Sequence, residues 1–270
     1  MNRINECLQQ FKSQGRKALV GYIVSGDPFL DATLPAMHKL VAEGVDIIEL
    51  GIPFSDPMAD GPVIQLAHER ALANNVSLTD TLAVVTEFRK TNSYTPVILM
   101  GYANPVERMG YKAFASLAKN SGIDGILTVD LPPEEALGLN VELKSVGIEN
   151  IFLLAPSTTI ERANMIVNMA GGFLYYVSLN GVTGAGNLDI DSVAAKVTEL
   201  RGLTDLPICV GFGIKDAESA AAVGNLADGV VIGSVLVKQA QLLAELGTDA
   251  VVEGMGGVVK PIRAALDALV

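Results

Sequence analysis

The stretch VDIIELGIPFSDPMADGP, residues 45–62, guides the interpretation of the whole chain. It begins as a short apolar run, ends that run with Glu49, and continues into a loop rich in proline, serine and aspartate. Such a short and continuous apolar run is typical of a parallel strand covered on both faces. A carboxylate at the end of a buried strand indicates either proton-transfer chemistry or hydrogen bonds to the amides of its loop.

Seven further runs of the same kind follow or precede this one. They lie at residues 18–24, 96–101, 124–129, 150–155, 173–178, 206–211 and 229–233. The segments between them, such as DATLPAMHKLVAEG (31–44), have helical spacing, and several end in a glycine typical of a C-cap. Eight strand–helix units in about 250 residues predict an α/β (β/α)8 TIM barrel. A doubly wound sheet is the alternative, but the first turn, SGDP, is no dinucleotide-binding fingerprint.

The two ends of the chain predict additional helices. Ile4, Cys7, Leu8 and Phe11 have the spacing of an amphipathic helix before the first strand. The last twenty residues, 251–270, predict a further helix on the barrel exterior. Because no linker or shift in composition divides the chain, we expect one domain over residues 1–270.

Composition restricts the classes of function. A net charge of −11 without a basic stretch argues against nucleic acid and anionic membranes as partners. Half of the residues are hydrophobic, yet no apolar run approaches the roughly 18 residues of a membrane span. The polar N-terminus does not resemble a signal peptide, and Cys7 and Cys209 match no metal-binding spacing, so we expect a reduced cytoplasmic protein. His38 and His68 fall in separate predicted helices, which indicates surface or packing residues rather than metal ligands.

Polar residues at the C-terminal ends of the strands are the candidates for a site, because TIM barrels place their active sites there. These candidates are Glu49, Asp56, Asp60, Tyr102, Asn104, Asp130, Ser178, Thr183, Gly213 and Ser234. Apolar surroundings would raise the pKa of Glu49 and suit it to general acid or base catalysis. Asp60 precedes a predicted helix, so it either starts that helix or reaches the same ligand as Glu49. Asp46 and Asp124 start strands and are expected to serve stability at the opposite end.

Glycine-rich segments after the last strands indicate a phosphate site. VGFGIKD (210–216) follows the seventh strand, and VVIGSVLVK (230–238) runs from the eighth strand into a helix. Glycines let backbone amides approach an anion, and loops after strands seven and eight commonly bind phosphate in this fold. A third segment, NGVTGAGN (180–187), is expected to act as a lid. The alternative is that these glycines only make tight turns.

Five segments together resemble the tryptophan synthase alpha chain family. They are ELGIPFSDPMADGP (49–62), GYANP (101–105), YYVSLNGVTG (175–184), GFGI (211–214) and GVVIGS (229–234). The resemblance covers essentially the whole chain, with matching order and spacing. It implies cofactor-free retro-aldol cleavage of indole-3-glycerol phosphate to indole and D-glyceraldehyde 3-phosphate, a lyase reaction of tryptophan biosynthesis. It also implies an α2β2 heterotetramer in which a pyridoxal-phosphate beta chain receives the indole.

The resemblance also assigns roles to individual residues. Glu49 is the implied general acid and base, and Asp60 the second catalytic carboxylate. The implied substrate-binding residues are Tyr22, Tyr102, Tyr175, Phe212 and Thr183. The implied phosphate-binding residues are Gly184, Gly213, Gly233 and Ser234. The chain departs from the family's pattern in having Tyr22 where phenylalanine is expected, and Gly186 where arginine is common.

Other functions remain as alternatives. None of the eight predicted strands contains a lysine, which argues against a Schiff-base aldolase and against indole-glycerol phosphate synthase. A phosphoribosyl isomerase could share the phosphate loops but not the segment GIPFSDPMADGP. A free-standing lyase that releases indole remains possible, as does a catalytically silent partner that only regulates a beta chain. Intact Glu49 and Asp60 argue against the silent partner.

Overall fold

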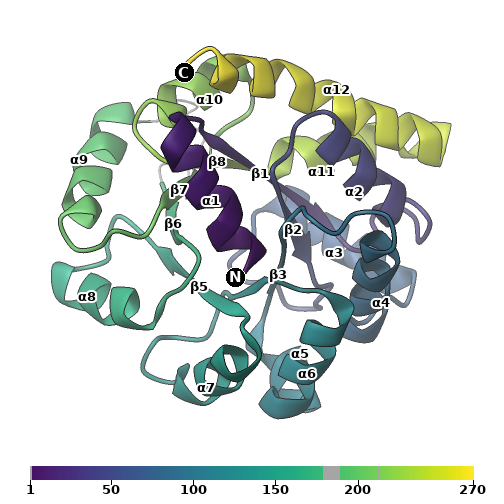
Figure 1. Ribbon diagram of the computed structural model, residues 1–270. Coiled ribbons are helices and arrows are strands. Elements are labelled where there is room, and N and C mark those ends of the chain that lie inside the picture. Colours follow the sequence, from purple (N-terminus) through teal and green to yellow (C-terminus); the bar gives the residue numbers. More distant parts are fainter. Residues whose placement is uncertain (1, 179–188, 212) are drawn as a thin grey trace.

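The computed structural model describes residues 2–178, 189–211 and 213–270. Eight parallel strands form a closed barrel in chain order, which confirms the predicted (β/α)8 architecture (Figure 1). The strands are β1 (Ala18–Val24), β2 (Ile47–Gly51), β3 (Val97–Gly101), β4 (Gly125–Thr128), β5 (Glu149–Leu154), β6 (Leu174–Val177), β7 (Ile208–Gly211) and β8 (Gly229–Ile232).

Helices surround the barrel and cover its outer face (Figure 1). They are α1 (Arg3–Gln14), α2 (Thr33–Ala42), α3 (Pro62–Ala73), α4 (Leu78–Arg89), α5 (Ala103–Met109), α6 (Tyr111–Ser121), α7 (Leu137–Val146), α8 (Ile160–Met169), α9 (Ile190–Arg201), α10 (Ala217–Gly224), α11 (Ser234–Leu243), the 3-10 turn η1 (Ala244–Leu246) and α12 (Thr248–Asp267). Gly122 and Gly147 end α6 and α7 in the left-handed region, with φ of 87° and 73°. These two helices therefore stop where the C-cap glycines predict.

Helix α1 closes the N-terminal end of the barrel. It crosses that end in Figure 1, and its buried residues Ile4 and Leu8 pack against the inward side chains of the strands, including Val20, Ile47 and Cys209. The apolar stripe predicted for the N-terminal segment therefore fills the floor of the barrel.

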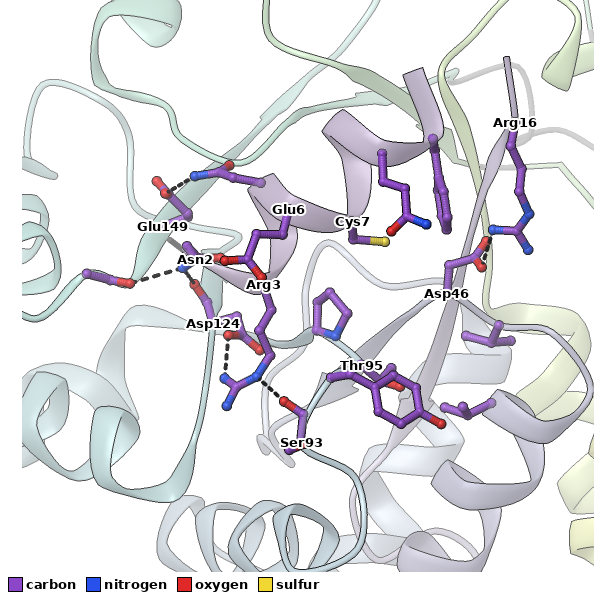
Figure 2. Close-up of a pocket in the computed structure, with 18 of the residues that line it drawn as sticks. Asn2, Arg3, Glu6, Cys7, Arg16, Asp46, Ser93, Thr95, Asp124 and Glu149 are labelled. Atoms are coloured by element: carbon purple, nitrogen blue, oxygen red, sulfur yellow. Dashed lines mark hydrogen bonds and ion pairs between the residues drawn. The ribbon is translucent and has the colours of Figure 1, made fainter. Parts of the chain in front are cut away.

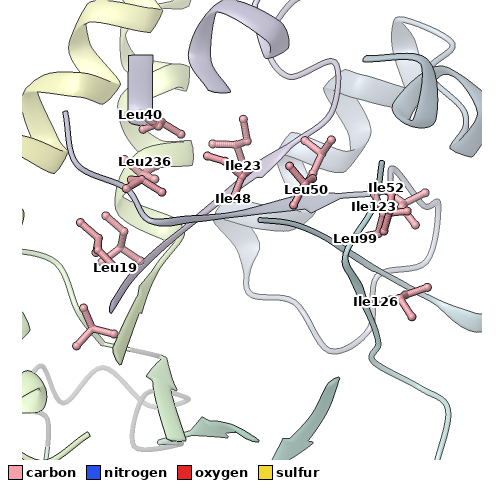
Figure 3. Packing of buried hydrophobic residues seen from close by; sticks show 14 of the residues in the cluster. Leu19, Ile23, Leu40, Ile48, Leu50, Ile52, Leu99, Ile123, Ile126 and Leu236 are labelled. Carbon is pink, nitrogen blue, oxygen red and sulfur yellow. The ribbon is translucent and has the colours of Figure 1, made fainter. Parts of the chain in front are cut away.

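The outer faces of the strands form the larger hydrophobic core. Figure 3 shows part of this core, with Leu19, Ile48 and Leu50 from β1 and β2, Leu40 from α2 and Leu236 from α11. Helix α12 lies on the outside against α2, α10 and α11, as predicted for the C-terminal segment. Within the described ranges, no helix is long and apolar enough to cross a membrane.

Buried ion pairs hold the N-terminal end together. Asp124 accepts hydrogen bonds from Arg3 and Arg89, each at 2.8 Å. Asp46 pairs with Arg16 at 2.6 Å and with Arg263 at 3.0 Å. Four of these groups, Arg3, Arg16, Asp46 and Asp124, line an open cavity of about 1240 Å³ beside α1 (Figure 2). Both acids therefore have the structural role that their strand-start positions predict.

Candidate active site

Strand alternation points Glu49 into the barrel mouth. Ile47, two residues earlier in β2, belongs to the interior cluster, so Glu49 shares its inward face. The parallel register places Glu49 beside Tyr22 of β1. The side chain is buried, and burial together with the charge of Asp60 raises its pKa to about 8. Glu49 Oε2 has no hydrogen-bond partner among the described residues, so this acid is not used merely to bind loop amides there.

The loop after β2 brings Asp60 to the same mouth. Tyr102, at the end of β3, donates its hydroxyl hydrogen bond to Asp60 Oδ2 at 2.8 Å and accepts one from the Ala59 amide at 3.1 Å. The Phe54 and Tyr102 rings stack with centroids 5.0 Å apart. Tyr102 therefore holds the loop and its carboxylate, in addition to any wall it provides for a substrate ring.

Tyr22 and Tyr175 are the other two tyrosines on the inner face of the barrel near Glu49 and Asp60. Burial first, and then the nearby carboxylates Glu49 and Asp60, raise the pKa of both phenols well above the ordinary value. Their hydroxyls fit because neighbouring strands end in glycine. A Cβ on Gly51 would lie 2.5 Å from the Tyr22 hydroxyl, and one on Gly211 would lie 2.6 Å from that of Tyr175. Sequence reasoning missed both glycines, although each lies two residues after an inward-facing residue of its strand, Glu49 or Cys209.

The phosphate candidates occupy the ends of β7 and β8. Gly213 has a φ of 78°, which favours glycine, and Gly233 is the N-cap of α11. Ser234 is the first residue of α11 and is exposed. Among the described residues, no side chain caps this helix, so its first amides can bind an anion. Phe212, Thr183, Gly184 and Gly186 lie outside the described residues.

Of the four other strand-end candidates, three make hydrogen bonds near the mouth and one is exposed. The Asp130 carboxylate accepts a hydrogen bond from the Ala103 amide at 2.7 Å, and Ser178 donates to the Gly211 carbonyl at 3.3 Å. Asp56 accepts a hydrogen bond from the Ser55 hydroxyl, and Asn104 is exposed on α5. These contacts indicate roles in shaping the rim.

His68 is the site residue that the sequence analysis did not recognise. It lies on α3 and is 2% exposed; its Nδ1 accepts the Phe54 amide hydrogen bond at 3.2 Å, and its Nε2 lies 3.6 Å from Asp60 Oδ2. The signal was present, because Ile64, His68 and Ala71 form the i, i+4, i+7 stripe of the helix that follows Asp60. His38, by contrast, packs against Phe88 as expected.

The arrangement of the His, Cys, Asp and Glu side chains determines whether a metal ion can bind. In the part of the chain that the structure describes, no three His, Cys, Asp or Glu side chains are grouped to hold a metal ion.

Comparisons with known proteins show the family of the chain. The family model described as tryptophan synthase alpha chain matches residues 8–255. The chain is 53% identical over 270 residues to the tryptophan synthase alpha chain of Acinetobacter baumannii, with 100% of each chain covered. It is 54% identical to that of Marinobacter nauticus, covering 100% of this chain and 99% of the relative.

A solved structure has the same fold. The crystal structure of tryptophan synthase subunit alpha from Legionella pneumophila superposes with a TM-score of 0.93 at 45% identity, covering 99% of both chains. The chain therefore belongs to the tryptophan synthase alpha chain family, the lyases that cleave indole-3-glycerol phosphate to indole and D-glyceraldehyde 3-phosphate.

Proposed function

We propose that Glu49 is the general acid and base of this cleavage and that Asp60 is the second catalytic carboxylate. The observation that carries the proposal is an inward carboxyl group at a strand end with a pKa of about 8. At neutral pH such a group holds a proton and can give it up, which suits it to acid and base steps in one cycle.

The steps follow from where charge develops. Glu49 protonates C3 of the indole ring, and the resulting positive charge spreads to the ring nitrogen. Asp60 accepts the ring N–H and stabilises that charge. Glu49, now a carboxylate, removes the proton of the adjacent side-chain hydroxyl; the carbonyl forms as the carbon–carbon bond breaks, and its electron pair returns to the ring. Glu49 ends the cycle protonated, so no external acid, base or cofactor is consumed.

The remaining residues bind the substrate. Tyr22, Tyr102 and Tyr175 line the pocket for the indole ring, where their edges and faces favour an aromatic guest. Gly233 and Ser234 bind the phosphate at the first amides of α11, and Gly213 binds it through the loop after β7. Phe212, Thr183 and Gly184 are assigned to ring and phosphate binding through the family resemblance alone.

The chain works as one unit over residues 1–270 in the cytoplasm and needs no cofactor of its own. It assembles with a beta chain into an α2β2 heterotetramer, and the beta chain carries the pyridoxal phosphate and takes up the indole. Support for this partner is membership of the tryptophan synthase alpha chain family. A free-standing lyase and a silent regulatory partner are the competing functions.

One assay separates these functions. We expect indole release from indole-3-glycerol phosphate by the purified chain, faster when a cognate beta chain is titrated in. Glu49→Gln should keep the fold and lose roughly 10²–10⁴-fold in rate, the scale expected for a general acid/base. A Glu49→Gln variant that keeps most of the turnover would contradict the catalytic assignment. A rate that is unaffected by a demonstrated complex would favour the free-standing lyase, and no indole under any condition would favour the silent partner.

A further inference from the structure

We propose that His68 is a positioning residue that holds the Asp60 carboxylate in the orientation needed to accept the ring N–H. This inference rests on the proposed role of Asp60. His68 itself does not touch the substrate in the proposal; it acts through Asp60.

The His68 ring is fixed in place by its helix. Helix α3 begins two residues after Asp60, and Ile64, Ala67 and Ala71 bury its inner face together with His68. With 2% of its surface exposed, the imidazole has little freedom to rotate away from the loop. A donor on this ring is therefore a rigid reference point for the neighbouring carboxylate.

The hydrogen bond from the Phe54 amide assigns the proton on the ring. That amide donates to Nδ1 at 3.2 Å, so Nδ1 is the acceptor and the neutral ring carries its hydrogen on Nε2. In the described part of the molecule Nε2 has no hydrogen-bond partner, and the acid oxygen facing it is Asp60 Oδ2 at 3.6 Å. A buried donor without an acceptor is unfavourable, which favours a small movement of Asp60 towards His68.

Two donors thus converge on the same oxygen of Asp60. The Tyr102 hydroxyl lies 2.8 Å from Oδ2, and His68 Nε2 approaches that oxygen from α3. Because both act on Oδ2, they fix the plane of the carboxylate and direct Oδ1 to the indole N–H. One donor alone would leave the carboxylate free to rotate about that contact.

The other charges near His68 do not compete for its proton. Asp27 is also within electrostatic reach of His68. However, Arg70 neutralises Asp27 through hydrogen bonds of 2.6 and 3.1 Å. Asp60 is thus the carboxylate towards which His68 Nε2 is directed.

Two substitutions separate positioning from simple support of the loop. In His68→Asn the amide oxygen takes the place of Nδ1 and keeps the Phe54 contact, but nothing reaches Asp60. In His68→Gln the longer side chain brings its amide nitrogen near the place of Nε2 and loses the Phe54 contact. We expect His68→Asn to lose about 10- to 100-fold in kcat with little change in KM, the scale of a misplaced catalytic group. His68→Gln should recover most of that loss.

The same assay in an Asp60→Asn background completes the test. If His68 acts only through Asp60, His68→Asn lowers kcat no further once Asp60 is changed. Wild-type kcat in His68→Asn, or kcat as low in His68→Gln as in His68→Asn, would overturn the positioning role. If His68→Asn does not fold, the kcat of His68→Gln decides alone. An Asp60→Asn variant with full kcat would instead refute the proposed function of Asp60, which keeps the two failures distinguishable.

Discussion

Glu49 combines two properties that rarely occur together at the residue scale, full burial and an unpartnered oxygen among the described groups. Burial penalises the ionised form, and the charge of Asp60 adds to that penalty, so the pKa rises from 4.5 to about 8. The side chain that makes the proposed proton transfers therefore favours the folded state only while it is protonated.

This leads to a prediction about stability and pH. The unfolded chain releases the Glu49 proton near pH 4.5, whereas the folded chain keeps it until about pH 8. Wild-type stability from this group is complete below pH 4.5 and is lost as pH rises through that window. Glu49→Gln removes the ionisation. The melting temperature of the variant minus that of the wild type should therefore increase as pH rises from 5 to 8.

The measurement is thermal unfolding of both proteins at several pH values. Exposed Glu245→Gln serves as the matched control and should show no such divergence. A constant difference between Glu49→Gln and wild type across this window would contradict the buried-acid account.

Some of these residue roles are readable from sequence and others are not. Glu49 is predictable because a strand alternates its faces, so an acid two residues after Ile47 must point inward. The contacts of Tyr102 and His68 with Asp60 are not, because they depend on how loop 53–60 folds back over β3 and α3. Loop geometry has no period in the sequence, so it has to be seen.

At the scale of elements, the Tyr22 side chain of β1 packs against Gly51 of β2. A Cβ on Gly51 would lie 2.5 Å from the Tyr22 hydroxyl but 3.0 Å from the nearest ring carbon. We expect Gly51→Ala to lose about 1–3 kcal/mol of unfolding free energy through overpacking. Adding Tyr22→Phe, which removes the hydroxyl, should restore most of it. Urea unfolding of the two single variants and the double variant tests this coupling, and additive losses would show that Gly51 matters for another reason.

Helix α11 supplies a second prediction at this scale. If its uncapped N-terminus binds the substrate phosphate, glycerol phosphate at a hundredfold excess over Kd should stabilise the fold by about 2.7 kcal/mol. Ser234→Asp should abolish this protection by like-charge repulsion, whereas Ser234→Asn, of similar size but neutral, should retain part of it. The check is the melting shift with and without glycerol phosphate. Equal protection in both variants would place the anion elsewhere.

On the scale of the whole molecule, the barrel divides its work between its two ends. Asp124 precedes β4 at the N-terminal end of the barrel, where it accepts hydrogen bonds from Arg3, Arg89 and the Val97 amide. The carboxylates of the proposed active site lie at the opposite, C-terminal end of the strands. Asp124→Ala should therefore cost about 3–5 kcal/mol of stability, the scale for breaking a buried ion pair, and leave kcat of the folded enzyme unchanged.

The matched control is the exposed pair of Glu134 and Arg162. Glu134→Ala should change the free energy of unfolding far less than Asp124→Ala, because solvent screens that pair. Chemical denaturation gives both values, and kcat is compared well below the melting temperature. A fall in kcat for Asp124→Ala at full folding would show that the two ends are coupled.

The whole fold was more predictable than the site. Eight apolar runs with helical segments between them leave little choice but a barrel, and the limits of β1 agree with the predicted run 18–24. What the pattern could not reveal is that α1 fills the floor, since an amphipathic stripe identifies a buried face without naming what covers it. Packing partners far apart in sequence, such as Ile4 and Phe173, are set by the closed topology.

Among the described residues, α1 closes the N-terminal end of the barrel, so the C-terminal mouth is the end through which ligands pass. Ile4 and Leu8 occupy the axis below the strands, so nothing as wide as an indole ring can drain through the bottom. Whatever enters by the mouth must leave by the mouth, and a partner that collects one product there has to sit across the route of the other. If a beta chain takes up indole at the mouth, as proposed, it therefore has to leave the aldehyde phosphate a path out of the same end.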